Sequence, residues 1–149
     1  MTPPDYLLQK ARNFCAYQER SLYDVKQKLE QWKASEETIE EIISKLKEEN
    51  FLDEERFAKV FAVGKLRNNK WGKNKIIHYL MQKKVPDLYI QIGLQEIDDE
   101  EYTNTLKVVL SSKKVASKDE FIKKNMLAKY AIQKGFQPEL VWKVLNGDI

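Results

Sequence analysis

The sequence predicts an all-α protein in which three tandem three-helix, helix-turn-helix-like repeats form a curved, elongated array. Only five glycines and four prolines interrupt 149 residues, which favours helices over a sheet with many turns. Apolar positions also recur at an offset of 51 residues, which indicates a repeated unit. The expected repeats are residues 1–51, 52–97 and 98–149. The aligned triples are Leu29, Leu80 and Ala131; Ile39, Ile90 and Val141; Ile42, Gly93 and Val144; and Ile43, Leu94 and Leu145.

Capping signals divide the first repeat into three helices. Tyr6 is expected to face inward in the first helix, on one stripe with Leu7, Ala11 and Phe14. Ser21 and Asp24 form an S-x-x-D capping box that begins the second helix. Ser35 is expected to cap the third helix, and Asn50 to end it in the left-handed conformation.

The second repeat follows the same order. Asp53 is expected to begin its first helix, with Phe57, Val60 and Phe61 facing inward. Gly72 is expected to begin the second helix and Pro86 the third.

The third repeat shows similar signals further along the chain. Ser117 with Glu120 predicts a capping box for its second helix. Pro138 suits the first turn of the closing helix, which Gly147 is expected to end.

Composition narrows the function classes. With 42% hydrophobic and 33% charged residues the chain reads as a soluble, cytoplasmic protein without a membrane span, and we expect a monomer. The single cysteine, Cys15, is expected to be core-facing, so no disulfide or cysteine cluster forms. The only histidine, His78, has no nearby carboxylate in sequence. No enzyme motif is present, and we expect no catalytic residue, no metal site and no cofactor.

Charge is distributed unevenly along the chain. Residues 56–85 hold nine lysines and arginines and no acidic residue, whereas acidic residues gather in the predicted third helices and at the starts of the first helices. Such segregation predicts a basic ridge for a phosphate backbone or an acidic protein surface, although lysines commonly serve only to solubilise a helix. Trp71 either packs between two helices or stacks on a base. The predicted ridge comprises Arg20, Arg56, Lys59, Lys65, Arg67, Lys70, Trp71, Lys73, Lys75, Lys83, Lys113, Lys114, Lys123 and Lys124.

Three motifs resemble the RecX family of RecA regulators: YQERSLYDVKQKL at 17–29, NFLDEERFA at 50–58 and KWGKNKI at 70–76. The resemblance covers about residues 6–146. It implies a non-enzymatic regulator, most often an inhibitor, that binds in the groove of the RecA–DNA filament. There it would modulate ATP hydrolysis, strand exchange and filament growth in homologous recombination, DNA repair and the SOS response. The chain departs from the family at Gln18 and Glu19, where arginine or proline is common, and after Trp71-Gly72, where lysines and Asn74 replace arginines.

Two alternatives remain open from the residues. A helix-turn-helix-like protein could bind single- or double-stranded DNA without RecA, although the second helices carry few of the side chains that read base edges. A protein-interaction scaffold without any nucleic-acid contact is the other alternative.

Overall fold

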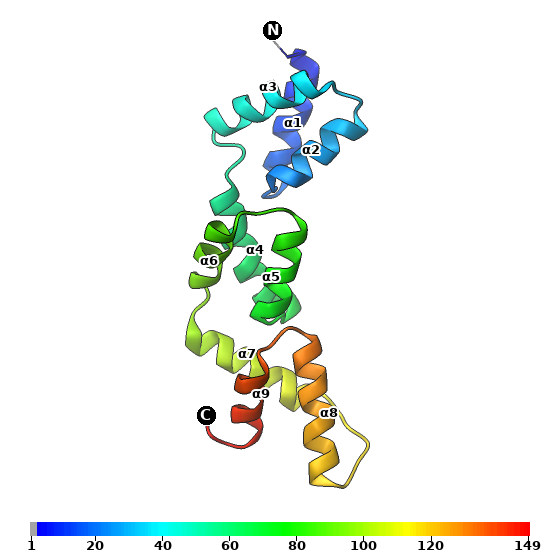
Figure 1. The fold of residues 1–149 in the computed structure, drawn as a ribbon, viewed down its shortest axis with the longest axis vertical. Coiled ribbons are helices and arrows are strands. Elements are labelled where there is room, and N and C mark those ends of the chain that lie inside the picture. The colour runs from blue at the N-terminus through cyan, green and yellow to red at the C-terminus, as the bar shows by residue number, and fades with distance from the viewer. Residues whose placement is uncertain (1–2) are drawn as a thin grey trace.

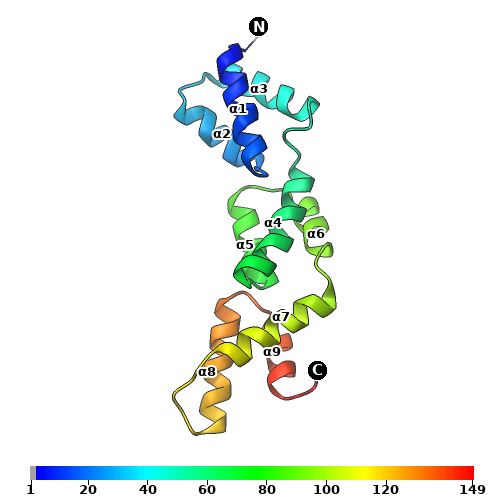
Figure 2. The same cartoon turned by 180° about the vertical axis from the view of Figure 1, so that it is seen from behind.

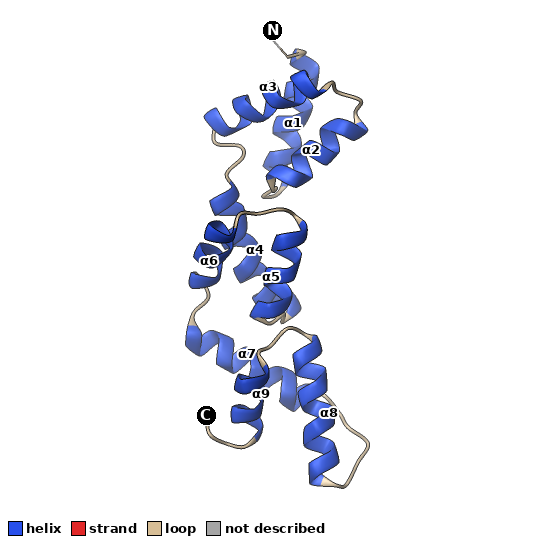
Figure 3. Ribbon diagram, in the orientation of Figure 1, coloured by secondary structure: helices blue, strands red, loops and turns tan. Residues whose placement is uncertain are grey.

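The computed structural model describes residues 3–149, which form nine α-helices and no strand in an elongated array (Figure 1, Figure 3). Helices α1 and α8 lie toward opposite ends of the array (Figure 1). Each predicted repeat contains three of these helices. The helices are α1 Asp5–Tyr17, α2 Leu22–Gln31, α3 Glu36–Glu48, α4 Glu54–Asn69, α5 Lys73–Gln82, α6 Asp87–Gln95, α7 Asp99–Ser112, α8 Glu120–Gln133 and α9 Pro138–Leu145.

Most predicted helix ends are confirmed. The Ser21 hydroxyl accepts from the Asp24 backbone N–H, and the Asp24 carboxylate accepts from the Ser21 N–H, which completes the capping box. Ser35 caps α3, Asp53 caps α4, and Gly72 and Pro86 occupy the N-cap positions of α5 and α6. Pro138 is the first residue of α9. Asn50 and Gly147 adopt the expected positive φ angles, 63° and 78°.

Three local predictions were wrong. Asp119, not Ser117, caps α8 by accepting from the N–H groups of Phe121 and Ile122, because its carboxylate is the nearer acceptor and Ser117 bonds Asp119 instead. Tyr6 is 71% exposed, since its neighbour Leu7 takes the inward position. Val60 is 52% exposed, since the buried stripe of α4 runs through Phe57, Ala58, Ala62 and Leu66.

The buried side chains form two cores. Repeat 1 has its own core, which includes Leu29 and Ile42, both fully buried. Repeats 2 and 3 share one continuous core, which extends from Phe57 in α4 to Val141 in α9. Repeats 2 and 3 are therefore one packed body, whereas repeat 1 packs largely by itself.

Backbone atoms join repeat 2 directly to repeat 3. The Gly72 N–H donates to the Lys134 carbonyl at 2.8 Å, and the Asn74 N–H donates to the Gly135 carbonyl at 2.9 Å. A Cβ atom on Gly72 would overlap the backbone of Gly135 and Phe136. The two segments of the chain can approach this closely only because residue 72 is glycine. The Tyr102 hydroxyl adds a third link by accepting from the Lys73 N–H.

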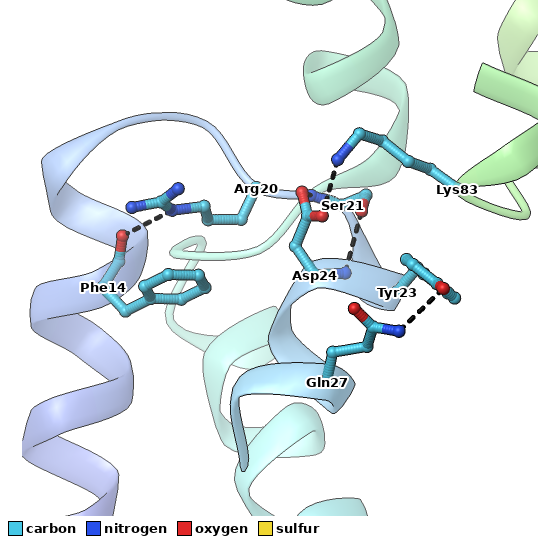
Figure 4. A network of polar contacts seen from close by, with 7 residues as sticks. All are labelled: Phe14, Arg20, Ser21, Tyr23, Asp24, Gln27 and Lys83. Carbon is cyan, nitrogen blue, oxygen red and sulfur yellow. Dashed lines mark hydrogen bonds and ion pairs between the residues drawn. The ribbon is translucent and has the colours of Figure 1, made fainter. Parts of the chain in front are cut away.

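Ion pairs join repeat 1 to repeat 2. The Arg56 Nε atom lies 2.7 and 2.9 Å from the two carboxylate oxygens of Glu19, across 37 residues of sequence. The Lys83 ammonium lies 2.7 Å from Asp24, the residue that completes the α2 capping box (Figure 4). Salt screens ion pairs, so it should weaken the contacts between repeats 1 and 2. The buried apolar contacts between repeats 2 and 3 should not weaken in this way.

The turns between second and third helices repeat their backbone geometry. Lys33, Lys84 and Gly135 occupy equivalent positions, 51 residues apart, and have φ angles of 60°, 57° and 103°. Two lysines accept this unfavourable left-handed conformation at the first two turns. The third turn uses glycine because a side chain there would strike Lys75.

Candidate functional site

The second helix of every repeat lies along one edge of the array. Helices α2, α5 and α8 follow one side, and α3 and α6 lie on the opposite side, in both views (Figure 1, Figure 2). Basic residues are concentrated in α5, α8 and the segment before α8, whereas α3 begins with Glu36 and Glu37 and carries further acids. The fold thus places a basic second-helix edge, formed by α5 and α8, opposite α3, whose glutamates form the acidic edge of the array.

Arginines serve the fold. Arg12 pairs with Glu49 at 2.6 Å, Arg56 pairs with Glu19, and Arg67 pairs with Glu101 at 2.7 Å. The remaining arginine of the sequence, Arg20, donates to the Phe14 carbonyl and lies 3.8 Å from the Phe14 ring centroid (Figure 4). Arg12 lowers the pKa of Glu49 through its hydrogen bond, and Arg67 does the same for Glu101.

The thirteen basic residues of the predicted ridge therefore divide into two groups. Those with intramolecular polar partners are Arg20, Arg56, Arg67, Lys83 and Lys59, the last lying 3.8 Å from Glu55 and 3.7 Å from Glu96. The lysines of the second group make no ion pair within residues 3–149. They are Lys65, Lys70, Lys73, Lys75, Lys113, Lys114, Lys123 and Lys124.

Several unpaired lysines lie over aromatic rings. Lys65 and Lys75 place their ammonium groups 4.9 and 4.6 Å from the Trp71 ring centroid. Lys73 lies 4.8 Å from the Tyr102 ring, and Lys113 lies 4.7 Å from the Tyr130 ring. A cation–π contact holds an ammonium group loosely, so it stays available to an anion.

Trp71 packs between α4 and α5 and is partly buried against the shared core. Its ring contacts Phe61 at 6.4 Å and Tyr79 at 4.7 Å between centroids. Trp32 and Trp142 are also partly buried against the cores of their own parts of the chain. Packing at the elbow between helices is therefore the observed role of Trp71, and its exposed part remains available to a ligand.

A groove of about 450 Å³ opens beside Trp71, where repeat 1 meets repeat 2. Its walls come from the turn after α1, the start of α2, one face of α4, the turn between α4 and α5, and the end of α5. Sequence reasoning did not find this groove, although a glycine inside the helical pattern of α4 was a usable signal. The lining residues are Gln18, Glu19, Asp24, Phe57, Val60, Phe61, Gly64, Lys65, Asn68, Asn69, Trp71, Tyr79 and Lys83.

Two titratable groups with strongly shifted pKa values are part of the packing. Burial raises the pKa of the Cys15 thiol to about 11, and burial raises the pKa of the Tyr102 hydroxyl to about 12. Cys15 is buried, as expected, and exposed His78 contacts Gln82 at 3.2 Å.

Within residues 3–149, no group of three or more His, Cys, Asp or Glu side chains is arranged to hold a metal ion. No helix in that range is long and apolar enough to span a membrane.

Family comparisons match two segments of the chain. The model of the first three-helix domain of RecX matches residues 8–46, and that of the second matches residues 53–94. Proteins named "Regulatory protein RecX" are among the relatives. The one from Lactobacillus johnsonii is 39% identical over 65% of this chain and 36% of its own length. The one from Prosthecochloris aestuarii is 27% identical over 93% of this chain and 91% of its own length.

Solved RecX structures share the fold. One, a crystal structure of regulatory protein RecX, has a TM-score of 0.82 at 20% identity and covers 95% of this chain and 73% of its own. RecX from Lactobacillus salivarius has a TM-score of 0.81 at 19% identity, covering 96% of this chain and 94% of its own. The chain spans 36–50% of the length of the first three curated relatives.

Proposed function

The chain belongs to the RecX family, and from this premise we propose that it is a non-enzymatic regulator, most directly an inhibitor, of the RecA recombinase. It binds in the groove of the RecA–DNA filament and slows ATP hydrolysis, strand exchange and filament growth. This action places it in recombination, DNA repair and the SOS response. We further propose that it works in the cytoplasm as a monomer.

The unpaired lysines on the second-helix edge are the observation that supports this proposal. The arginines and Lys83 are held by partners within the chain, whereas Lys123 and Lys124 of α8 make no ion pair in the described part. Uncompensated lysines along one edge of an elongated array create a positive field that suits a polyanionic groove. The acidic edge formed by α3 then faces basic protein surfaces of the filament or solvent.

The division of the chain into two packed bodies also supports binding across neighbouring recombinase subunits. Repeats 2 and 3 share a core and present their lysines as one unit. Repeat 1 is attached through Arg56 and Lys83, whose partners are carboxylates at the surface of repeat 1. Repeat 1 can therefore adjust its orientation at small cost when the array meets a helical filament.

The test is DNA-dependent ATP hydrolysis by the host recombinase, titrated with this protein. We expect inhibition at well below one protein per recombinase subunit. The variant Lys123→Glu/Lys124→Glu should inhibit at least tenfold less well, because it reverses the charge of two lysines that make no ion pair within the described residues. If both lysines meet phosphates, the slope of log affinity against log salt should also fall by about 2.

Lys45→Glu/Lys47→Glu is the matched control, since it changes the same charge on exposed positions of α3, the acidic edge. Equal inhibition by wild type and the α8 variant would contradict the role of the basic edge. DNA binding without any effect on the recombinase would instead favour a direct DNA-binding protein. If the protein neither inhibits the recombinase nor binds DNA, a protein-interaction scaffold is favoured.

A further inference from the structure

Gly64 lies in the interior of α4, where the packing of neighbouring atoms does not require a glycine. Glycine is less favourable than alanine inside a helix. A Cβ atom built on Gly64 would have Asn68 Nδ2, at 3.9 Å, as its nearest neighbour, which is ordinary contact. By contrast, Gly72, Gly93 and Gly135 each lie against atoms that leave no room for a side chain. What Gly64 keeps open is the groove beside Trp71, which it lines.

The wall of the groove is aromatic and partly exposed. Phe57, Phe61, Trp71 and Tyr79 form a chain of ring contacts, with centroids 5.5, 6.4 and 4.7 Å apart in that order. Tyr79 is 38% exposed. Such rings offer a stacking surface for a flat, unsaturated ligand.

The charged groups around these rings favour an anion. The two acidic side chains of the groove, Glu19 and Asp24, are already neutralised by Arg56 and Lys83. Lys65 and Lys75 remain, and neither makes an ion pair in the described chain. A flat ligand with a flanking negative charge therefore complements the groove.

Amide side chains complete the groove. Asn68 and Asn69 follow Gly64 at the end of α4, and Gln18 lies on the wall formed by repeat 1. Amide groups present a donor and an acceptor together, which suits the edge of a base. The volume of about 450 Å³ lies in the range of small-ligand sites.

We propose that the groove between repeats 1 and 2 binds an unpaired nucleobase of single-stranded DNA, stacked against Trp71 and Tyr79 above Gly64. Lys65 and Lys75 leave the Trp71 ring as the base arrives and contact the flanking phosphates. Asn68, Asn69 and Gln18 bond the base edge. This proposal rests on the proposed function for its biological setting, but its test contains no recombinase, so the two can fail separately.

The test is a fluorescence titration. In the variant Trp32→Phe/Trp142→Phe, Trp71 is the only tryptophan, and we expect an eight-nucleotide oligo(dT) at low salt to quench its emission. A strand of the same length with abasic sites keeps the phosphates and should bind without quenching. Placing Trp71→Phe in the wild-type background should leave the remaining tryptophan emission unchanged by oligo(dT).

A groove-filling substitution separates binding from stability. Gly64→Gln in the single-tryptophan protein should fold at least as stably, because glutamine favours a helix, and should weaken oligo(dT) binding about tenfold or more. Met81→Gln is the control, since Met81 is 63% exposed on α5 and does not line the groove.

Three results would overturn the proposal. They are equal quenching by oligo(dT) and the abasic strand, undiminished binding by the Gly64 variant, and no oligonucleotide binding at all. In the last case inhibition of ATP hydrolysis could persist, which would retain the proposed function while rejecting a base in this groove.

Discussion

Replacing Gly72 with alanine is expected to separate repeat 2 from repeat 3. Gly72 lies at the start of α5, where its N–H donates to the Lys134 carbonyl, and a new Cβ atom would overlap the backbone of the turn before α9. Backbone atoms cannot move aside as a flexible side chain can. The two segments must therefore part, which disturbs the packing of fully buried Phe136.

The magnitude follows from the contacts that are lost. The hydrogen bonds from Gly72 and Asn74 to the turn contribute about 1 kcal/mol each. Forcing a methyl group into a closely packed site costs about 1–3 kcal/mol. We therefore expect Gly72→Ala to lower the free energy of unfolding by about 3–5 kcal/mol.

Denaturant unfolding followed by circular dichroism measures this effect. Gly64→Ala is the matched control, because it adds the same methyl group where there is open space, and it should stabilise the protein by about 0.5–1 kcal/mol. The two substitutions should thus change stability in opposite directions. A change of less than 1 kcal/mol for Gly72→Ala would refute the inferred contact between the turn and α5.

Three further changes test other contacts. Arg56→Met should cost about 1–2 kcal/mol, because it removes the bifurcated hydrogen bond from Arg56 Nε to Glu19, and it should separate the unfolding of repeat 1 from that of the rest. This loss should shrink at high salt in denaturant titrations. Burial raises the pKa of Tyr102 from 10.0 to about 12 in the folded state. Its contribution to the free energy of unfolding should therefore be complete below pH 10 and lost as the pH rises toward 12. Tyr102→Phe should abolish that loss in a stability profile measured at alkaline pH. Cys15, with a pKa raised from 9.0 to about 11, should react with iodoacetamide at pH 8 at least tenfold more slowly than in denatured protein, as mass spectrometry would show.

Local chemistry explains why most helix ends could be predicted. A capping residue such as Ser21 or Asp53 satisfies backbone groups within its own turn, so sequence alone identifies it. The α8 cap was wrong because Ser117 and Asp119 are both acceptable caps two residues apart. Only the path of the chain chose between them.

The candidate site was less predictable. Lysine and arginine are equivalent in a charge count, but Arg56 and Arg67 pair with carboxylates 37 and 34 residues away in the sequence. No local pattern predicts those pairs. The groove beside Trp71 brings the turn after α1 against α4, and no local pattern encodes that approach.

The sequence by itself determined an all-helical chain of repeated three-helix units, because helix period, caps and the 51-residue offset act over short or regular distances. The tertiary structure decided how the units are joined. It fused repeats 2 and 3 through a glycine contact at Gly72, attached repeat 1 through ion pairs, and separated the lysines that stay unpaired from the arginines that stabilise the fold. Those outcomes depend on which side chains from distant segments meet, and only the folded chain specifies those meetings.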